Sequence, residues 1–205
     1  MTSVRLAVLG DSIAYGQGAT RAADAPGPRL AAALEAAGHH TDVRVVAVPG
    51  ARSSGLDAQV TRALTGSPDV AVIIVGANDL ARFVPADEAA GQLERAVRRL
   101  VAANVEVIVA PAPDLSVVPW VPPQLRAAVR GASAALRAAQ RRVVEAAGAH
   151  LADADAATSE AFAADPALFS ADRFHPSSAG YAVIADALAP AVLAAAGRVR
   201  SQRAV

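Results

Sequence analysis

Short apolar runs alternate along the chain with segments of helical periodicity, and this alternation restricts the possible folds more than any other feature. Near-continuous apolar runs are typical of strands that are buried on both faces, as in parallel sheets. Between them, apolar residues recur every three or four positions, which is typical of helices with one buried side. The expected strands are Val4–Leu9, Val43–Val48, Val70–Val75, Val105–Ala110 and the weaker Ala149–Ala152.

The best-defined helical segment covers residues 86–104. Asp87 and Glu88 lie at its start and Arg98 and Arg99 near its end, an arrangement that complements the helix dipole. The same periodicity predicts further helices over 28–37, 54–64, 124–147 and 177–196. Strands that alternate with helices in this way form βαβ units, so we predict an α/β protein with a doubly wound parallel sheet.

Nothing in the sequence divides the chain into separate domains. Its 205 residues fit one α/β domain with a substantial core, and neither an internal repeat nor a linker is visible. Irregular structure is expected over 17–27, 111–123 and 152–174. We therefore predict one domain over 1–197, followed by a disordered basic tail over 198–205.

Charge and composition exclude several classes of function. Lys plus Arg and Asp plus Glu both number 19, so there is no electrostatic reason to expect nucleic acid or an anionic membrane as a partner. The chain has no cysteine, which excludes disulfides, thiolate catalysis and cysteine-bound metal. No secretory signal is visible and no apolar run looks able to span a bilayer, so a cytoplasmic protein without a transmembrane segment is expected. A secreted chain trimmed of its signal would look the same.

Polar or glycine residues follow each of the first three expected strands. Gly10-Asp11-Ser12 follows the first strand, Pro49-Gly50 the second and Gly76-Ala77-Asn78-Asp79 the third. A further polar motif, Asp172-x-x-His175, precedes the last expected helix. Loops at the carboxyl ends of parallel strands share one edge of the sheet, so residues that are distant in the sequence can meet there.

The residue types at this edge suit nucleophilic catalysis by a serine. The Ser12 hydroxyl is a poor nucleophile until an imidazole accepts its proton, and His175 can be that base. Asp172 lies three residues earlier and can accept the other ring proton, which fixes the tautomer of the imidazole. The backbone N–H groups of Ser12 and Gly50 and the side-chain amide of Asn78 are the natural donors to an oxyanion.

Other acids and histidines are weaker candidates for these roles. Asp153 and Asp155 follow the fifth strand and could also orient the imidazole, but Asp172 lies nearer to the histidine in the sequence. Asp11 and Asp79 are expected to bond to backbone groups of their own turns. No ligand spacing typical of a metal site links the remaining histidines, which are His39, His40 and His150. Neither a metal nor another cofactor is predicted.

Together these motifs resemble the conserved blocks of the SGNH (GDSL-type) hydrolase family. Gly10-Asp11-Ser12 is similar to the first block, although Ile13 replaces the usual leucine. Gly50 is similar to the glycine of the second block, Gly76-Ala77-Asn78-Asp79 to the third block and Asp172-x-x-His175 to the fifth. The resemblance therefore runs through nearly the whole chain, with the blocks in the family's order.

The resemblance implies a three-layer α/β/α sandwich with a flavodoxin-like parallel sheet of about five strands. It also implies that Ser12 is the nucleophile, that Gly50 and Asn78 are oxyanion donors, that Asp172 is the acid and that His175 is the base. The implied activity is hydrolysis of an ester or thioester through an acyl-serine, without a metal. Lipids, acyl thioesters, acetylated sugars and small esters are all substrates in the family, so the expected partner is a small-molecule ester or thioester of open identity.

Two other functions are compatible with the sequence beside that of a metal-independent serine ester hydrolase. An acyltransferase would form the same acyl-serine but pass the acyl group to a sugar or an alcohol. A non-catalytic flavodoxin-like module would use the sheet edge to bind a small ligand, although the first loop lacks a Gly-x-Gly-x-x-Gly phosphate turn. The sequence leaves the oligomeric state open.

Two aromatic residues are candidates for the wall of a substrate pocket. Tyr15 follows the serine motif, and Trp120 lies in the proline-rich segment 111–123. Only 3% of the residues are aromatic, so packing in the local core is an equally good interpretation of both.

Overall fold

The computed structural model describes residues 2–152 and 155–203, and its centre is a five-stranded sheet. The strands are β1 (Thr2–Gly10), β2 (His39–Val45), β3 (Val70–Ile74), β4 (Glu106–Ala110) and β5 (His150–Leu151). Neighbouring strands pair in parallel in the order β2-β1-β3-β4-β5. This is the flavodoxin-like strand order. The predicted α/β fold is therefore confirmed.

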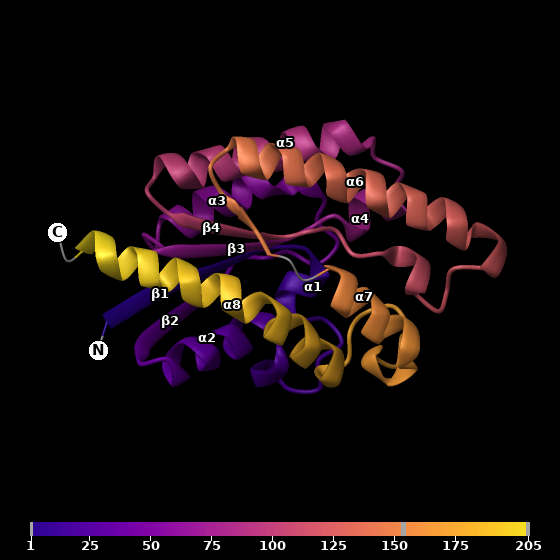
Figure 1. Cartoon of the computed structure of the whole chain (residues 1–205), viewed down its shortest axis with the longest axis horizontal. Coiled ribbons are helices and arrows are strands. Elements are labelled where there is room, and N and C mark those ends of the chain that lie inside the picture. The colour runs from indigo at the N-terminus through magenta and orange to yellow at the C-terminus, as the bar shows by residue number, and fades with distance from the viewer. Residues whose placement is uncertain (1, 153–154, 204–205) are drawn as a thin grey trace.

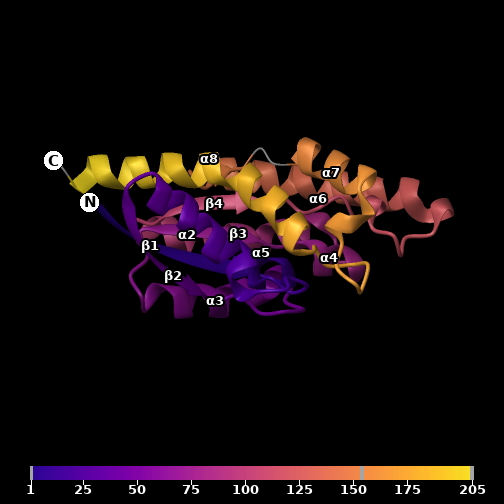
Figure 2. The same ribbon diagram turned by 90° about the horizontal axis from the view of Figure 1, so that it is seen from below.

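Helices cover both faces of this sheet and complete three layers. The helices are α1 (Ser12–Tyr15), α2 (Pro26–Ala36), α3 (Leu56–Leu64), α4 (Ala77–Ala81), α5 (Ala86–Ala102), α6 (Arg126–Ala146), α7 (Asp155–Ala164) and α8 (Ser178–Arg203). α2 and α8 pack on one face, and α3, α5 and α6 pack on the other (Figure 1). In the view turned by 90°, α8 runs along much of the length of the sheet (Figure 2).

Alternate residues of β1 enter the two cores on either side of the sheet. Leu6 and Val8 pack with α2 and α8, whereas Ala7 and Leu9 pack with α3 and α5. All four side chains are at most 1% exposed. A strand buried on both faces needs apolar residues at every position, which explains why this run was visible in the sequence.

The edge strand β2 differs from its prediction. It begins at His39 and ends at Val45, whereas the apolar run predicted a strand over 43–48. Exposed and half-buried residues alternate along it, so its amino-terminal part shows no continuous apolar run. Beyond the strand, the N–H groups of Val46 and Val48 still bond to carbonyls of β1, at 2.9 and 3.1 Å. Residues 46–48 therefore continue along β1 toward the carboxyl edge of the sheet.

Two segments that were predicted to be irregular are helical. α7 lies within the expected loop 152–174. The predicted disordered tail over 198–205 is wrong as far as Arg203, because α8 continues to that residue; positions 204–205 lie outside the described residues. Val199 is 6% exposed in the core between α8 and the sheet, and Arg198 donates a hydrogen bond to Glu106 at 2.8 Å. These contacts extend the packing of α8 beyond the predicted end.

One segment of α8 has the length and composition of a membrane span, although no transmembrane segment was predicted from the sequence. Among the described residues, one helical stretch, Ser178–Ser201, is long and apolar enough to cross a membrane by those two criteria alone. Its apolar character has a structural reason in this fold, since one side of the helix packs on the sheet. Leu188 and Val192, for example, are at most 1% exposed in that core.

Candidate active site

A glycine turn after β1 sets the position of the serine. Gly10 has a φ of +134°, and a Cβ at this position would lie 1.8 Å from the carbonyl oxygen of Ile74, so only glycine fits. Asp11 then accepts a hydrogen bond from the Ile13 N–H at 2.9 Å and caps α1, which is a bond within its own turn as predicted. Ser12 is consequently the first residue of α1, at the carboxyl end of β1.

The Asp172 carboxylate organises the loop that precedes α8. Its Oδ1 accepts hydrogen bonds from the backbone N–H groups of Phe174 and His175, both at 2.9 Å, and from the Ser170 hydroxyl at 2.8 Å. Its Oδ2 lies 2.6 Å from Nδ1 of His175. Burial opposes ionisation, but the hydrogen bonds from the His175 ring and from the backbone hold the pKa of Asp172 well below its usual range. The imidazole therefore faces a fixed anion.

His175 connects this loop with the serine. Its Nε2 lies 3.0 Å from the Oγ of Ser12, although 163 positions separate the two residues in the sequence. An ionised carboxylate only accepts hydrogen bonds, so the Nδ1 that faces Asp172 carries the proton and Nε2 is free to accept one. Ser12 is 5% exposed and the His175 side chain 12%. The pair is thus shielded from bulk water but not sealed.

Gly50 and Asn78, the other predicted oxyanion donors, lie in segments that are bonded together. Asn78, in the first turn of α4, donates an amide N–H to the carbonyl of Ala51 at 3.1 Å. The second N–H of the amide remains available for a substrate oxygen. Gly50 has a φ of +79°, and no atom of the described residues lies within 4 Å of a Cβ built there. The space in front of its backbone is open, so a substrate can approach it closely.

Asp79 holds these two segments together, whereas we predicted a bond within its own turn. Its fully buried carboxylate accepts hydrogen bonds from the N–H and the hydroxyl of Ser53, at 3.0 and 2.9 Å, across 26 positions of sequence. Burial raises the pKa of Asp79. Burial also raises the pKa of Asp11 to about 7, against the opposing effect of the Ile13 N–H bond and with help from the charge of Asp79. Burial therefore makes both carboxylates, Asp11 and Asp79, difficult to ionise.

Two buried glutamines, neither of which was a predicted site residue, clamp the ends of the strands. Gln59 of α3 accepts a hydrogen bond from the Gly10 N–H at 2.7 Å and donates one to the Gly10 carbonyl at 2.9 Å. Gln140 of α6 accepts from the Ala112 N–H at 2.8 Å and donates to the Val75 carbonyl at 3.1 Å. The sequence did contain a signal for both glutamines: each is a polar residue at a helix position where the periodicity predicts an apolar one.

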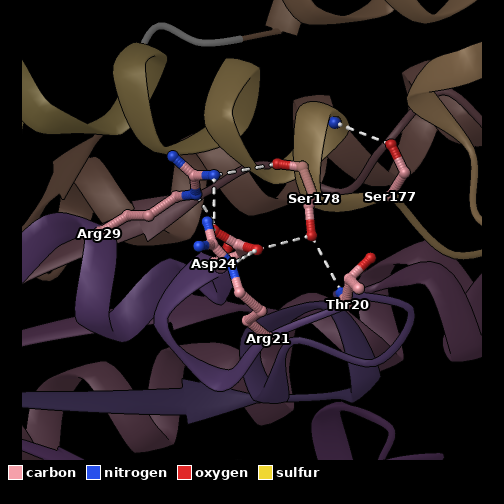
Figure 3. Close-up of polar contacts among 7 residues, drawn as sticks. Thr20, Arg21, Asp24, Arg29, Ser177 and Ser178 are labelled. Atoms are coloured by element: carbon pink, nitrogen blue, oxygen red, sulfur yellow. Dashed lines mark hydrogen bonds and ion pairs between the residues drawn. The ribbon is translucent and has the colours of Figure 1, made fainter.

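A polar cluster fixes the start of α8, three residues after His175 (Figure 3). The Ser178 hydroxyl donates to Oδ2 of Asp24 at 2.9 Å and accepts a hydrogen bond from the Thr20 N–H at 2.9 Å. The hydrogen bond from Arg21, with a second from Ser178, lowers the pKa of Asp24 to about 2. The segment that follows the serine is therefore bonded to the segment that follows the base.

The two aromatic pocket candidates lie on the surface. Tyr15 is 55% exposed and Trp120 is 70% exposed. Trp120 nevertheless contacts the site loop, because its indole N–H donates a hydrogen bond to the backbone carbonyl of Asp172 at 2.9 Å. It covers that loop from outside.

An apolar cavity of about 110 Å³ adjoins the site. Its wall includes Ile13, which follows Ser12, and Phe174 and Pro176, which flank His175. Neither Tyr15 nor Trp120 is among the described residues that line it. Phe174 also packs edge-on against the His175 ring, with the ring centroids 5.0 Å apart. Residues that are adjacent in sequence to Ser12 and His175 therefore form part of the cavity wall.

The alternative histidines lie away from this constellation. His39 and His40 begin β2 and His150 begins β5, so these histidines lie at the amino ends of their strands, whereas Ser12 follows the carboxyl end of β1. Asp155 is the first residue of α7, and Asp153 lies outside the described residues. Within the described ranges, no three His, Asp or Glu side chains gather in a way that could hold a metal ion.

A serine that contacts an imidazole, which in turn contacts a carboxylate, at the edge of a parallel sheet is the arrangement found in serine hydrolases. Comparison with known proteins points to the same class. The chain belongs to the GDSL-like lipase/acylhydrolase family, whose model matches residues 8–183. The family resemblance predicted from the four motifs is confirmed.

The chain is also similar to a particular curated protein, the GDSL-like esterase Rv1075c of Mycobacterium tuberculosis. The two are 38% identical over 189 residues, which cover 90% of this chain and 60% of the relative. The chain thus spans about 60% of the length of that protein.

Solved structures share the fold at low sequence identity. TesA superposes with a TM-score of 0.78 at 20% identity, over 93% of this chain and 99% of TesA. A variant of Axe2, an acetylxylan esterase from Geobacillus stearothermophilus, superposes with a TM-score of 0.76 at 21% identity, over 94% of this chain and 95% of Axe2. These matches show that the three-layer fold is shared over most of the length of this chain.

Proposed function

We propose that this protein hydrolyses ester bonds through an acyl intermediate on Ser12. One observation carries the proposal: the Oγ of Ser12 lies 3.0 Å from Nε2 of His175, whose Nδ1 lies 2.6 Å from Asp172. A serine bonded to a base that a carboxylate orients is the arrangement that makes a hydroxyl nucleophilic. Membership of the GDSL-like family supports an ester or thioester as the substrate.

In the proposed reaction, His175 accepts the hydroxyl proton of Ser12 while Oγ attacks the acyl carbon. Asp172 stays ionised and stabilises the imidazolium, as its lowered pKa allows. The tetrahedral intermediate collapses when His175 protonates the leaving alcohol or thiol, and the acyl group remains on Ser12. Water, deprotonated by His175, then attacks the acyl carbon. The second tetrahedral intermediate collapses as the bond to the Oγ of Ser12 breaks and His175 returns the proton to Oγ, which releases the carboxylic acid.

The tetrahedral intermediates carry a negative oxygen that needs fixed hydrogen-bond donors. We assign this role to the backbone N–H groups of Ser12 and Gly50 and to the second amide N–H of Asn78. The bond from Asn78 to Ala51 and the clamp of Asp79 on Ser53 hold these segments in place before the substrate arrives. Donors that need no reorganisation contribute most to stabilising such charge.

The same mechanism predicts that no metal ion takes part, because each proton transfer and each hydrogen bond is supplied by the chain itself. Prolonged incubation with EDTA followed by gel filtration is expected to leave the rate of p-nitrophenyl acetate hydrolysis unchanged. Activity that is lost with the chelator and restored by a divalent cation would overturn metal independence.

The nucleophile can be tested by covalent labelling. A fluorophosphonate probe is expected to modify Ser12 in the folded protein, as peptide mass spectrometry would show. Ser12→Ala is expected to lose the label and to lower kcat for p-nitrophenyl acetate by about 10³-fold or more. Ser54→Ala, at an exposed serine, is the matched control and should keep both. A Ser12→Ala protein that still hydrolyses the ester would refute the proposal.

A further inference from the structure

We infer that the apolar cavity beside the site binds the acyl chain of the substrate and selects uncharged acyl groups of about six carbons. The inference rests on the proposed function, since it assigns the cavity to the group that becomes attached to Ser12. Among the lining residues are Ile13, Ala77 and Phe174, which directly follow the nucleophile, precede the amide donor and precede the base. Neighbouring Cα atoms lie about 3.8 Å apart, so the wall begins within one residue of all three groups.

The chemistry of the wall fits a hydrocarbon chain. Leu115 and Val118 from the loop after β4 and Phe162 from α7 contribute to it, and no Lys, Arg or His is among the described lining residues. The one carboxylate in the wall, Asp114, already accepts the Ser116 N–H at 2.9 Å. The nearby Arg130 already pairs with Asp114 at 3.8 Å, so a terminal carboxylate or phosphate would be buried there without a free cationic partner, which is strongly unfavourable.

The size of the cavity sets the expected chain length. An engineered apolar cavity of about 150 Å³ binds benzene, which corresponds to roughly 25 Å³ for each carbon. On that scale a cavity of about 110 Å³ takes about four carbons. If the carbonyl carbon stays at Ser12 and one further carbon lies between it and the cavity, hexanoyl is the best-fitting linear group.

The order of the two steps favours the acyl chain over the alcohol as the occupant. The alcohol must leave after the first half of the reaction, while the acyl group remains bonded to Ser12 until water attacks. The cavity lies between α7, α8, the loop after β4 and the site loop, with Phe162, Ile184, Leu115 and Pro176 in its wall. A site lined by four segments of the chain suits the group that stays bonded to Ser12 through both steps.

The inference is tested with two ester series. For p-nitrophenyl esters from acetate to dodecanoate, kcat/KM is expected to rise about fourfold for each added methylene up to hexanoate, then to level off or fall. For alkyl acetates from ethyl to hexyl, the alcohol length should change kcat/KM less than threefold. A flat acyl series, or a rise confined to the alkyl acetates, would overturn the assignment.

Variants of the cavity wall give a second test. Val118→Phe reduces the free volume at a residue that is 5% exposed, so the hexanoate-to-acetate ratio of kcat/KM should fall at least tenfold. Val45→Phe, the same change at a site on β2 that is 40% exposed, should leave this ratio unaltered. Phe162→Ala enlarges the cavity and should move the optimum to octanoate or longer, which tests the inference even if Val118→Phe does not fold.

The result separates this inference from the proposed function. If p-nitrophenyl acetate is hydrolysed and Ser12 is labelled, but the hexanoate-to-acetate ratio is the same in the wild type and both wall variants, only the acyl-chain assignment is wrong. If no ester is hydrolysed and Ser12 is not labelled by the fluorophosphonate, the proposed function and the assignment both fail.

Discussion

The wild-type protein is expected to lose stability as the pH rises, because Asp11 is buried, and replacing Asp11 by Asn is expected to remove this loss. Asp11 is 1% exposed, and burial raises its pKa from 3.8 to about 7, partly offset by the Ile13 N–H bond. Between these two values the folded protein keeps a proton that the unfolded chain has released, so the free energy of unfolding falls with increasing pH. Asn keeps the oxygen that caps α1 but has no such proton.

The magnitude follows from the two pKa values of Asp11. A shift of about three units corresponds to about 4 kcal/mol at high pH, at 1.36 kcal/mol per unit. About 2 to 3 kcal/mol of this develops between pH 5 and pH 8. Asp172 and Asp24 have lowered pKa values, so their contributions are present above about pH 4 and are lost only as the pH falls further. They do not change within the measured window.

Urea unfolding of both proteins at pH 5 and pH 8 measures the effect. The stability of Asp11→Asn relative to the wild type is expected to be about 2 to 3 kcal/mol greater at pH 8 than at pH 5. Taking this difference cancels the titrating groups that do not interact with Asp11, whereas the charge of Asp79, which helps to raise the pKa of Asp11, is part of the effect. Asp42→Asn, at an exposed position of β2, should show no such change. A relative stability of Asp11→Asn that is the same at both pH values would refute the reasoning from burial.

The catalytic assignments lead to three further predictions, each measured by steady-state kinetics on p-nitrophenyl acetate. Asn78→Ala should lower kcat by about 10²–10³, the loss expected for one oxyanion donor, and an unchanged kcat would move that role elsewhere. Asp172→Asn should lower kcat by about 10⁴ because the imidazole then loses its correct tautomer; a loss under tenfold would contradict its orienting role. Ser178→Ala breaks the bond to Asp24 and should lower kcat tenfold or more with little change in KM, since a shift of about 1 Å in the base costs about 10². Ser178→Thr should restore the rate, and a pure KM effect would contradict positioning.

The central strands could be predicted from the sequence because both of their faces are buried. In β3, all five residues from Val70 to Ile74 are buried, so a continuous apolar run marks the strand. The edge strand β2 is only partly buried, and β5 consists of two residues whose pairing with β4 defines it. α7 lacked a clear apolar stripe and was missed. Elements were thus recognisable where burial alone determines the residue types.

The candidate site shows the same division between local and distant interactions. The turn at Asp11 and the bonds of Asp172 to its own loop connect residues no more than three positions apart, and short motifs reveal them. The bond of Asp79 to Ser53 and the clamp of Gln59 on Gly10 cross 26 and 49 positions. Such partners, like the wall of the apolar cavity, depend on how the helices pack.

A double-mutant cycle on Ser12 and His175 tests the central claim most directly, because it asks whether the two groups act as one unit. We expect Ser12→Ala, His175→Ala and the double variant to lower kcat for p-nitrophenyl acetate to the same level, within about threefold. Losses that multiply in the double variant would show that the two residues act independently, and this would contradict transfer of the serine proton to the imidazole 3.0 Å away.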